Sequence, residues 1–167
     1  MKKLTLIRHA KSSWKHPGLE DDHDRTLNKR GVRDATELSR RFHVHGSRLD
    51  LIFSSTAMRA RTTALAFLDT LGLADDHLRF DERLYLASKE ALVGVISGFP
   101  NEESEIAIVG HNPGMTALIN QLSDLGLENM PTCGVVELTY EIDSWADLPG
   151  ARPVSNWHDY PQRTWGN

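Results

Sequence analysis

The chain has 167 residues, of which 40% are hydrophobic and 25% are charged, and its formal net charge is −4 at pH 7. This size and composition predict one globular domain over residues 1–167. The negative net charge gives no reason to expect a nucleic-acid partner. The apolar segments are far shorter than the roughly 20 residues of a membrane span, and the single cysteine, Cys133, excludes an intrachain disulfide. We therefore expect a cytoplasmic protein that binds neither membranes nor nucleic acids.

Short apolar segments alternate with segments of helical periodicity from the N-terminus onward. Residues 3–9 predict a strand, and the polar residues 10–27 predict a long loop. Asn28 is expected to cap a helix that ends at Gly46. Its buried face is expected to hold the apolar residues at helical spacing, namely Val32, Ala35, Leu38 and Phe42.

The middle of the chain continues this alternation. Residues 49–55 predict a second strand, residues 57–71 a second helix, and residues 78–85 a weaker strand or extended segment. Ser88 is expected to cap a third helix, whose apolar side chains are Leu92, Val95, Ile96 and Phe99.

The last third contains the remaining predicted elements. Residues 105–109 predict a strand, and Asn112 followed by Pro113 predicts a helix start with a capping side chain and a proline in the first turn. Residues 134–142 predict a long alternating strand. Residues 144–167 predict an irregular tail that could add an edge strand. The order of elements predicts an α/β three-layer sandwich, with a mainly parallel central sheet and helices on both faces.

Four chemically distinctive side chains follow the predicted strands. Arg8 and His9 end the first strand, Arg59 follows the second, and His111 follows the strand before the last helix. Sites in such sheets lie at the carboxyl ends of the strands, so these residues could meet at one edge. Two guanidinium groups can hold phosphate oxygens, and a neutral histidine is a nucleophile toward phosphorus. This chemistry needs neither a metal nor a cofactor.

The same residues lie in motifs that resemble the histidine phosphatase superfamily. Arg8-His9-Ala10 is similar to the family's Arg-His-Gly, residues 54–64 to its Ser-Pro-x-x-Arg-Ala-x-x-Thr-Ala block, and Gly110-His111-Asn112 to its third block. Residues 25–31 resemble the Leu-Thr-x-x-Gly block that opens the first helix. The short chain and the Arg-His-Ala-Lys-Ser start are most similar to the SixA-type phosphohistidine phosphatases. The resemblance implies the phosphoglycerate mutase-like fold.

The resemblance also implies roles for individual residues. His9 would be the nucleophile, and Arg8, Arg59 and His111 would form the phosphate pocket. Ser12 takes a position where the family often has a serine near the phosphate, and Trp14 matches a common aromatic position. Lys11 and Tyr85 are expected to reach the rim of the pocket.

The departures from the family pattern bear on the substrate. Ala10 replaces a glycine beside the nucleophile, Thr56 replaces a proline, and Lys15 stands where mutase-like members often have asparagine. Glu82 lies in about the region of the family's general acid, but its surroundings differ. A weak acid site favours a P–N substrate, because imidazole leaves more easily than an alkoxide. The expected substrate is phosphohistidine on a signalling protein.

Several alternatives remain open from the sequence. The substrate could be a small phosphate ester, or the protein could bind a phosphoryl group without turnover. Asp22-His23-Asp24-Arg25-Thr26 matches the Asp-x-Asp-x-Thr motif of magnesium-dependent phosphatases, although a solvated loop is the simpler interpretation. Arg8 could instead be structural, paired with Asp50 or Glu105. His43 and His45 are interpreted as surface residues, since positions i and i+2 face different sides of a helix.

Overall fold

The computed structural model describes residues 1–14 and 21–163 of the chain, so Lys15 and Glu20, which we assigned to a loop, lie outside the described residues. The strands are β1 (Lys2–Arg8), β2 (Leu51–Ser54), β3 (Leu78–Phe80), β4 (Glu105–Gly110), β5 (Val135–Tyr140) and β6 (Ser155–Asp159). The α-helices are α1 (Lys29–Val44), α2 (Met58–Thr70), α3 (Lys89–Ser97) and α4 (Gly114–Leu122). Short 3-10 helices are η1 (Asp22–Asp24), η2 (Asp75–His77), η3 (Glu82–Leu84) and η4 (Trp145–Gly150).

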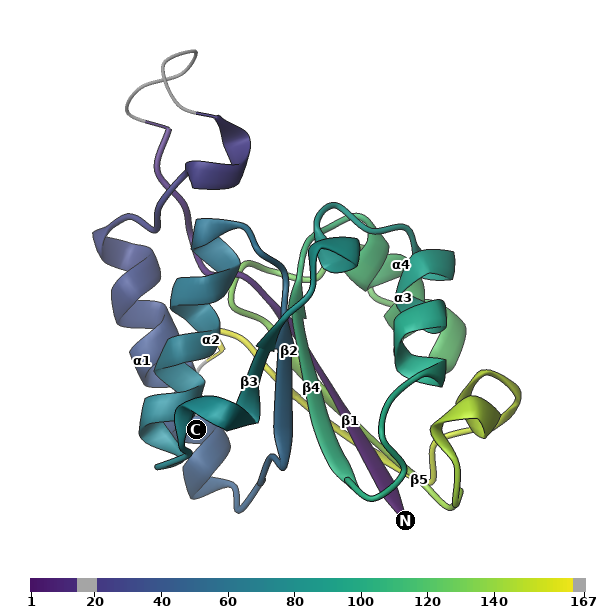
Figure 1. Cartoon of the computed structure of the whole chain (residues 1–167). Coiled ribbons are helices and arrows are strands. Elements are labelled where there is room, and N and C mark those ends of the chain that lie inside the picture. The colour runs from purple at the N-terminus through teal and green to yellow at the C-terminus, as the bar shows by residue number, and fades with distance from the viewer. Residues whose placement is uncertain (15–20, 164–167) are drawn as a thin grey trace.

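One six-stranded sheet, in the order β3-β2-β4-β1-β5-β6, forms the middle layer. Strands β1 to β4 are parallel, whereas β5 and β6 are antiparallel to their neighbours. Helices α1 and α2 cover one face of the sheet, and α3 and α4 cover the other (Figure 1). This arrangement confirms the predicted α/β three-layer sandwich. Because β5 is antiparallel to β1, the start of β5 lies at the same sheet edge as the carboxyl end of β1.

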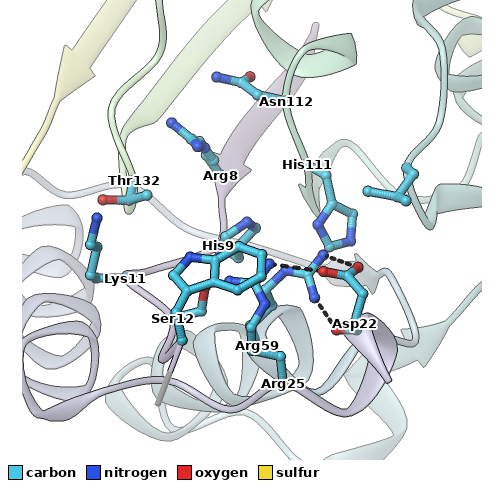
Figure 2. Close-up of a pocket in the computed structure, with 12 residues that line it drawn as sticks. Arg8, His9, Lys11, Ser12, Asp22, Arg25, Arg59, His111, Asn112 and Thr132 are labelled. Carbon is cyan, nitrogen blue, oxygen red and sulfur yellow. Dashed lines mark hydrogen bonds and ion pairs between the residues drawn. The ribbon is translucent and has the colours of Figure 1, made fainter. Parts of the chain in front are cut away.

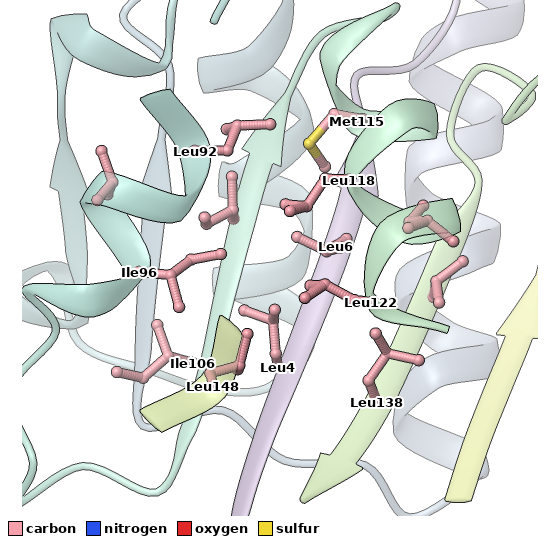
Figure 3. Packing of buried hydrophobic residues seen from close by; sticks show 14 of the residues in the cluster. Leu4, Leu6, Leu92, Ile96, Ile106, Met115, Leu118, Leu122, Leu138 and Leu148 are labelled. Carbon is pink, nitrogen blue, oxygen red and sulfur yellow. The ribbon is translucent and has the colours of Figure 1, made fainter. Parts of the chain in front are cut away.

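Buried side chains fill both interfaces between the sheet and its helices. The interface with α3 and α4 contains Leu4, Leu6, Ile106 and Leu118 among other residues (Figure 3), and the opposite interface contains Ile7, Leu38, Phe42 and Phe67. Each fully buried side chain of this kind contributes about 1.5–3 kcal/mol. The central strands are therefore a well-anchored base for the loops at their ends.

Two predicted elements that precede α3 differ from the structure in detail. Val32 is 52% exposed, and Gly31 takes the buried position instead, because α1 packs against the backbone of Lys11 there. The strand predicted over residues 78–85 ends at Phe80, since the Asp81 side chain accepts a hydrogen bond from the Arg83 backbone N–H and starts η3.

The end of the chain is more regular than expected. Helix α4 begins at Gly114 and not at Pro113, while the Asn112 side chain accepts hydrogen bonds from the backbone and the hydroxyl of Thr116. Strand β5 is buried along its whole length instead of alternating. The tail supplies η4 and the edge strand β6. Within the described residues, no helix is long and apolar enough to cross a membrane.

Candidate active site

A pocket of about 320 Å³ opens at the carboxyl edge of the parallel strands (Figure 2). It collects six of the eight predicted site residues, namely Arg8, His9, Lys11, Ser12, Arg59 and His111. The other lining residues are Trp14, Asp22, Arg25, Leu86, Asn112 and Thr132. Tyr85 lies beside the pocket, with its ring 5.5 Å from the ring of His111. Glu82 is exposed on η3 and is not among the lining residues.

Backbone hydrogen bonds fix His9 where β1 ends. Its N–H donates to the carbonyl of Gly110 at 3.1 Å, and its own carbonyl accepts from the Cys133 N–H at 3.1 Å. The next N–H, that of Ala10, donates to the Thr63 hydroxyl at 3.0 Å. Ala10 is fully buried and does not have a left-handed backbone. Alanine therefore fits where the family has glycine.

The surroundings of His9 determine its protonation. Its Nδ1 lies 2.8 Å from the Ala10 carbonyl, an acceptor, so Nδ1 carries the hydrogen and the lone pair is on Nε2. Burial lowers the pKa of His9 to about 4; the Ala10 carbonyl opposes this shift, and the charges of Arg59 and Arg8 add to it. The imidazole is thus neutral at pH 7, which is the form that can act as a nucleophile.

The second histidine lies against the first. The His111 ring centroid is 5.1 Å from that of His9, and its Nε2 is 2.7 Å from the Ser55 hydroxyl. Burial lowers the pKa of His111 to about 3. The positive charge that His9 gains in acid and the charge of Arg59 lower it further. Its Nδ1 is buried and has no hydrogen-bond partner among the described residues. His111 therefore has a free ring nitrogen beside the candidate nucleophile.

The two predicted arginines reach the pocket from different elements. Arg8 donates to the Met130 carbonyl at 2.8 Å, and burial lowers the pKa of its guanidinium. The alternative pairing of Arg8 with Asp50 or Glu105 is wrong, because Asp50 accepts from backbone N–H groups and Glu105 pairs with Lys3.

Arg59, in the first turn of α2, is only 2% exposed. It donates to the carbonyl of Asp22 at 2.6 Å and to its carboxylate at 2.9 Å. A guanidinium buried to this extent is held in one place, which suits it to bind a phosphoryl oxygen.

Asp22 and Arg25 are lining residues that sequence reasoning did not identify. The Asp22 carboxylate accepts hydrogen bonds from Arg59 at 2.9 Å, from Arg25 at 3.0 Å and from the Tyr85 hydroxyl at 2.5 Å. Burial disfavours the charged form of Asp22, but these bonds outweigh burial and hold its pKa well below the usual range. Arg25 lies in the Leu-Thr-x-x-Gly-like block, and this motif match is the one feature of the sequence that could have pointed to Arg25 as a site residue.

The Asp-x-Asp-x-Thr match does not have the structural context of a magnesium site. Asp22 to Asp24 form the 3-10 turn η1, whereas the motif should follow a hydrophobic strand. The Asp22 carboxylate is paired with two arginines, which leaves it poorly suited to hold a cation. Among the described residues, no group of three His, Cys, Asp or Glu side chains could hold a metal ion.

Comparison with known proteins agrees with this geometry. Residues 4–86 match the model of the histidine phosphatase superfamily, branch 1. An uncharacterized protein of Mycobacterium leprae is 33% identical over 144 residues, which cover 79% of this chain and 86% of that protein. The chain belongs to the histidine phosphatase superfamily.

Two solved structures resemble this histidine phosphatase along most of its length. One, from Agrobacterium tumefaciens, is provisionally named a phosphohistidine phosphatase SixA; it has 29% identity and a TM-score of 0.78, and the match covers 93% of this chain and 97% of that chain. The second, from Nakamurella multipartitia, carries the same provisional SixA name. It has 25% identity and a TM-score of 0.83, and the match covers 97% of each chain. The superfamily supports phosphatase activity.

Two lining residues of this histidine phosphatase, Ser12 and Trp14, contact Arg25. The Arg25 guanidinium donates to the Ser12 hydroxyl, and the indole of Trp14 stacks on it with its centroid 3.8 Å from the guanidinium carbon. Ser12 also forms an isolated β-bridge with Leu27. Arg25 therefore joins the segment after β1 to the segment before α1.

Proposed function

We propose that this histidine phosphatase hydrolyses phosphohistidine on a protein, through a phosphohistidine intermediate formed on His9. The observation that carries the proposal is the state of His9. Its ring is buried and neutral, and Nδ1 is occupied by a carbonyl, so the Nε2 lone pair is available in a pocket that contains guanidinium groups. That combination suits in-line attack on phosphorus.

The reaction has two displacements. The His9 Nε2 attacks phosphorus, and the bond between phosphorus and the substrate imidazole breaks. The substrate imidazole, protonated by solvent on its other ring nitrogen, takes the electron pair and leaves as the neutral ring. Arg8, Arg59 and His111 hold the phosphoryl oxygens as their charge is redistributed. Water then attacks phospho-His9, a P–O bond forms, the bond to Nε2 breaks, and inorganic phosphate is released. The water proton goes to solvent.

The carboxylates near the pocket favour a P–N bond over a P–O ester. Asp22 is the one carboxylate among the described lining residues, and its pKa is held well below the usual range, so it has no proton to donate at pH 7. Glu82 is exposed and outside the pocket. An alkoxide leaving group needs an acid more than an imidazole does. The site therefore suits phosphohistidine better than an alkyl phosphate.

The test is phosphate release from a phosphohistidine-containing protein in the presence of EDTA. We expect wild-type turnover, none above background for His9→Ala, and no change for His43→Ala, which alters an exposed histidine on α1. Rapid acid-free quenching should trap a phosphoenzyme only when His9 is present. Replacing Arg8, Arg59 or His111 with alanine should each lower kcat/KM by about a hundredfold or more.

The outcomes separate the alternatives. Wild-type activity in His9→Ala would contradict the covalent mechanism. Turnover of small phosphate esters without turnover of phosphohistidine would contradict the substrate, and binding without any turnover would contradict catalysis. Loss of activity in EDTA would point back to a metal-dependent reaction.

A further inference from the structure

Two large apolar side chains stand exposed at the mouth of the pocket. Trp14 is 63% exposed and Leu86 is 57% exposed, yet both line the same pocket as His9. They come from segments far apart in the sequence, one after β1 and the other between η3 and α3. An exposed leucine or tryptophan taken singly needs no explanation, but two beside a candidate nucleophile form an apolar rim. We call Trp14 and Leu86 the rim pair.

The backbone of Leu86 is held in an unfavourable conformation. Its φ is +50°, in the left-handed region that bulky side chains rarely adopt. Both flanking residues are fixed: the Tyr85 hydroxyl bonds to Asp22 at 2.5 Å, and the Ala87 carbonyl approaches Gly114 so closely that a Cβ there would be 2.0 Å away. The strained backbone and the exposed side chain of Leu86 do not stabilise the fold of the protein on its own. A role in contacting a ligand gives this leucine a reason to be there.

Trp14 is also fixed relative to the pocket. Its indole stacks on the Arg25 guanidinium at 3.8 Å, and Arg25 is in turn bonded to Ser12 and Asp22. The aromatic side chain is therefore held beside the phosphoryl-binding residues while most of its surface is open to a ligand. Such a preorganised ring can stack on another flat ring with little loss of conformational entropy.

We propose that the rim pair is a leaving-group subsite, which binds the imidazole ring of a protein phosphohistidine while the phosphoryl group lies on His9. The proposal rests on the proposed function, and it adds that the site also binds the imidazole leaving group attached to phosphorus. Trp14 and Leu86 line the same pocket as the guanidinium groups, so they are within reach of the substituent on a phosphoryl group held there. A sugar or glycerol substituent would place hydroxyl groups against apolar surface, where they lose hydrogen bonds to water. A flat imidazole loses far less.

The experiment compares two P–N substrates that differ only in the leaving group. Phosphoramidate releases ammonia and free 3-phosphohistidine releases an imidazole, so the ratio of their kcat/KM values reports contacts with the ring. We expect Trp14→Ala and Leu86→Ala each to lower the phosphohistidine-to-phosphoramidate ratio about tenfold, a loss typical of one apolar contact. The change should lie mainly in KM. Val44→Ala is the matched control, because Val44 is an apolar residue on α1, 71% exposed and outside the pocket, and its ratio should not change.

A further variant separates ligand contact from folding. Glycine suits a φ of +50°, so Leu86→Gly should have a Tm no lower than that of the wild type while the ratio still falls. An equal loss on both substrates in the Leu86 variants, or no change in the ratio for either residue of the rim pair, would overturn the subsite.

The failure of the subsite is distinguishable from failure of the proposed function. If the wild type turns over phosphoramidate and p-nitrophenyl phosphate but not phosphohistidine, the proposed substrate fails. The same variants are then compared on p-nitrophenyl phosphate and glycerol 3-phosphate. A ratio that falls in the variants supports a ring-binding rim, and an unchanged ratio overturns it.

Discussion

Replacing Asp22 with asparagine should destabilise the protein and tighten phosphate binding at the same time. The substitution keeps the shape of the side chain and removes the charge that pairs with Arg59 at 2.9 Å and with Arg25 at 3.0 Å. Arg59 is 2% exposed, but the Asp22 side chain is 39% exposed. The ion pair is therefore neither a surface pair nor a fully buried one.

This intermediate exposure sets the size of the effect. Breaking a buried pair costs about 3–5 kcal/mol and losing a surface pair costs about 0–1 kcal/mol, so we expect about 1–2 kcal/mol here. For a chain of 167 residues this corresponds to a Tm lower by about 3–6 °C at pH 7. Because the folded pKa of Asp22 is lowered, the contribution of Asp22 is present above its unfolded pKa and is lost as the pH falls through the folded value. The Tm difference should shrink in acid.

Phosphate binding should change in the opposite direction. In the wild type the Asp22 carboxylate occupies donors of Arg59 and Arg25 and repels an incoming anion. If the loss of the Asp22 charge makes phosphate binding more favourable by about 1.4 kcal/mol, the inhibition constant of inorganic phosphate as a competitive inhibitor should fall about tenfold. Asp24→Asn is the control, because it removes the same charge from an exposed position of the same turn. A variant with wild-type Tm and wild-type phosphate inhibition would refute the reasoning.

Three further predictions concern protonation and packing. Because the pKa of His9 is lowered to about 4 and only the neutral ring attacks, kcat/KM should fall on the acid side near pH 4; a limb near 6.5 would contradict this. Below pH 6.5, His9 and His111 bind protons in the unfolded state but stay neutral in the folded state. The Tm should therefore fall as the pH is lowered from 6.5 toward 4, and it should stay level above pH 6.5. Gly31→Ala would place a Cβ 2.0 Å from the Lys11 carbonyl, and we expect about 1–3 kcal/mol of destabilisation in chemical unfolding together with lower kcat/KM. Gly94→Ala, in α3 with open space around it, should leave stability unchanged or raised, and a Gly31 variant as stable as the Gly94 variant would contradict the packing.

The elements that the sequence predicted well are those in which the local pattern and the burial agree. Strands β1 and β4 are buried along nearly their whole length because both faces of the sheet are covered, and their ends carry Arg8, His9 and His111. The rule that sites lie at the carboxyl ends of parallel strands then brings these side chains together. The pocket contains all three.

The parts that the sequence did not predict depend on contacts between distant segments. Asp22 lies in a polar stretch without periodicity, and it enters the pocket because Arg59 and Tyr85 bond to it from 37 and 63 residues away. The His23 ring also contacts the Thr56 hydroxyl at 2.8 Å. Such pairings cannot be inferred from spacing. Gly31 is buried in place of Val32 for a similar reason, since the Lys11 backbone leaves no space for a side chain there.

The charges around His9 explain why this pocket suits a phosphoryl group. Three guanidinium groups, those of Arg8, Arg25 and Arg59, line it with one carboxylate, and both histidines are neutral at pH 7. With Lys11, which also lines the pocket, the cationic side chains exceed the one carboxylate by three charges, and a phosphoryl dianion would neutralise two of them. The same burial that lowers the histidine pKa values also makes an unbalanced cation costly. A bound phosphate or vanadate should therefore raise the Tm, and the gain should be greater for the wild type than for Arg8→Ala, which has one fewer charge to balance.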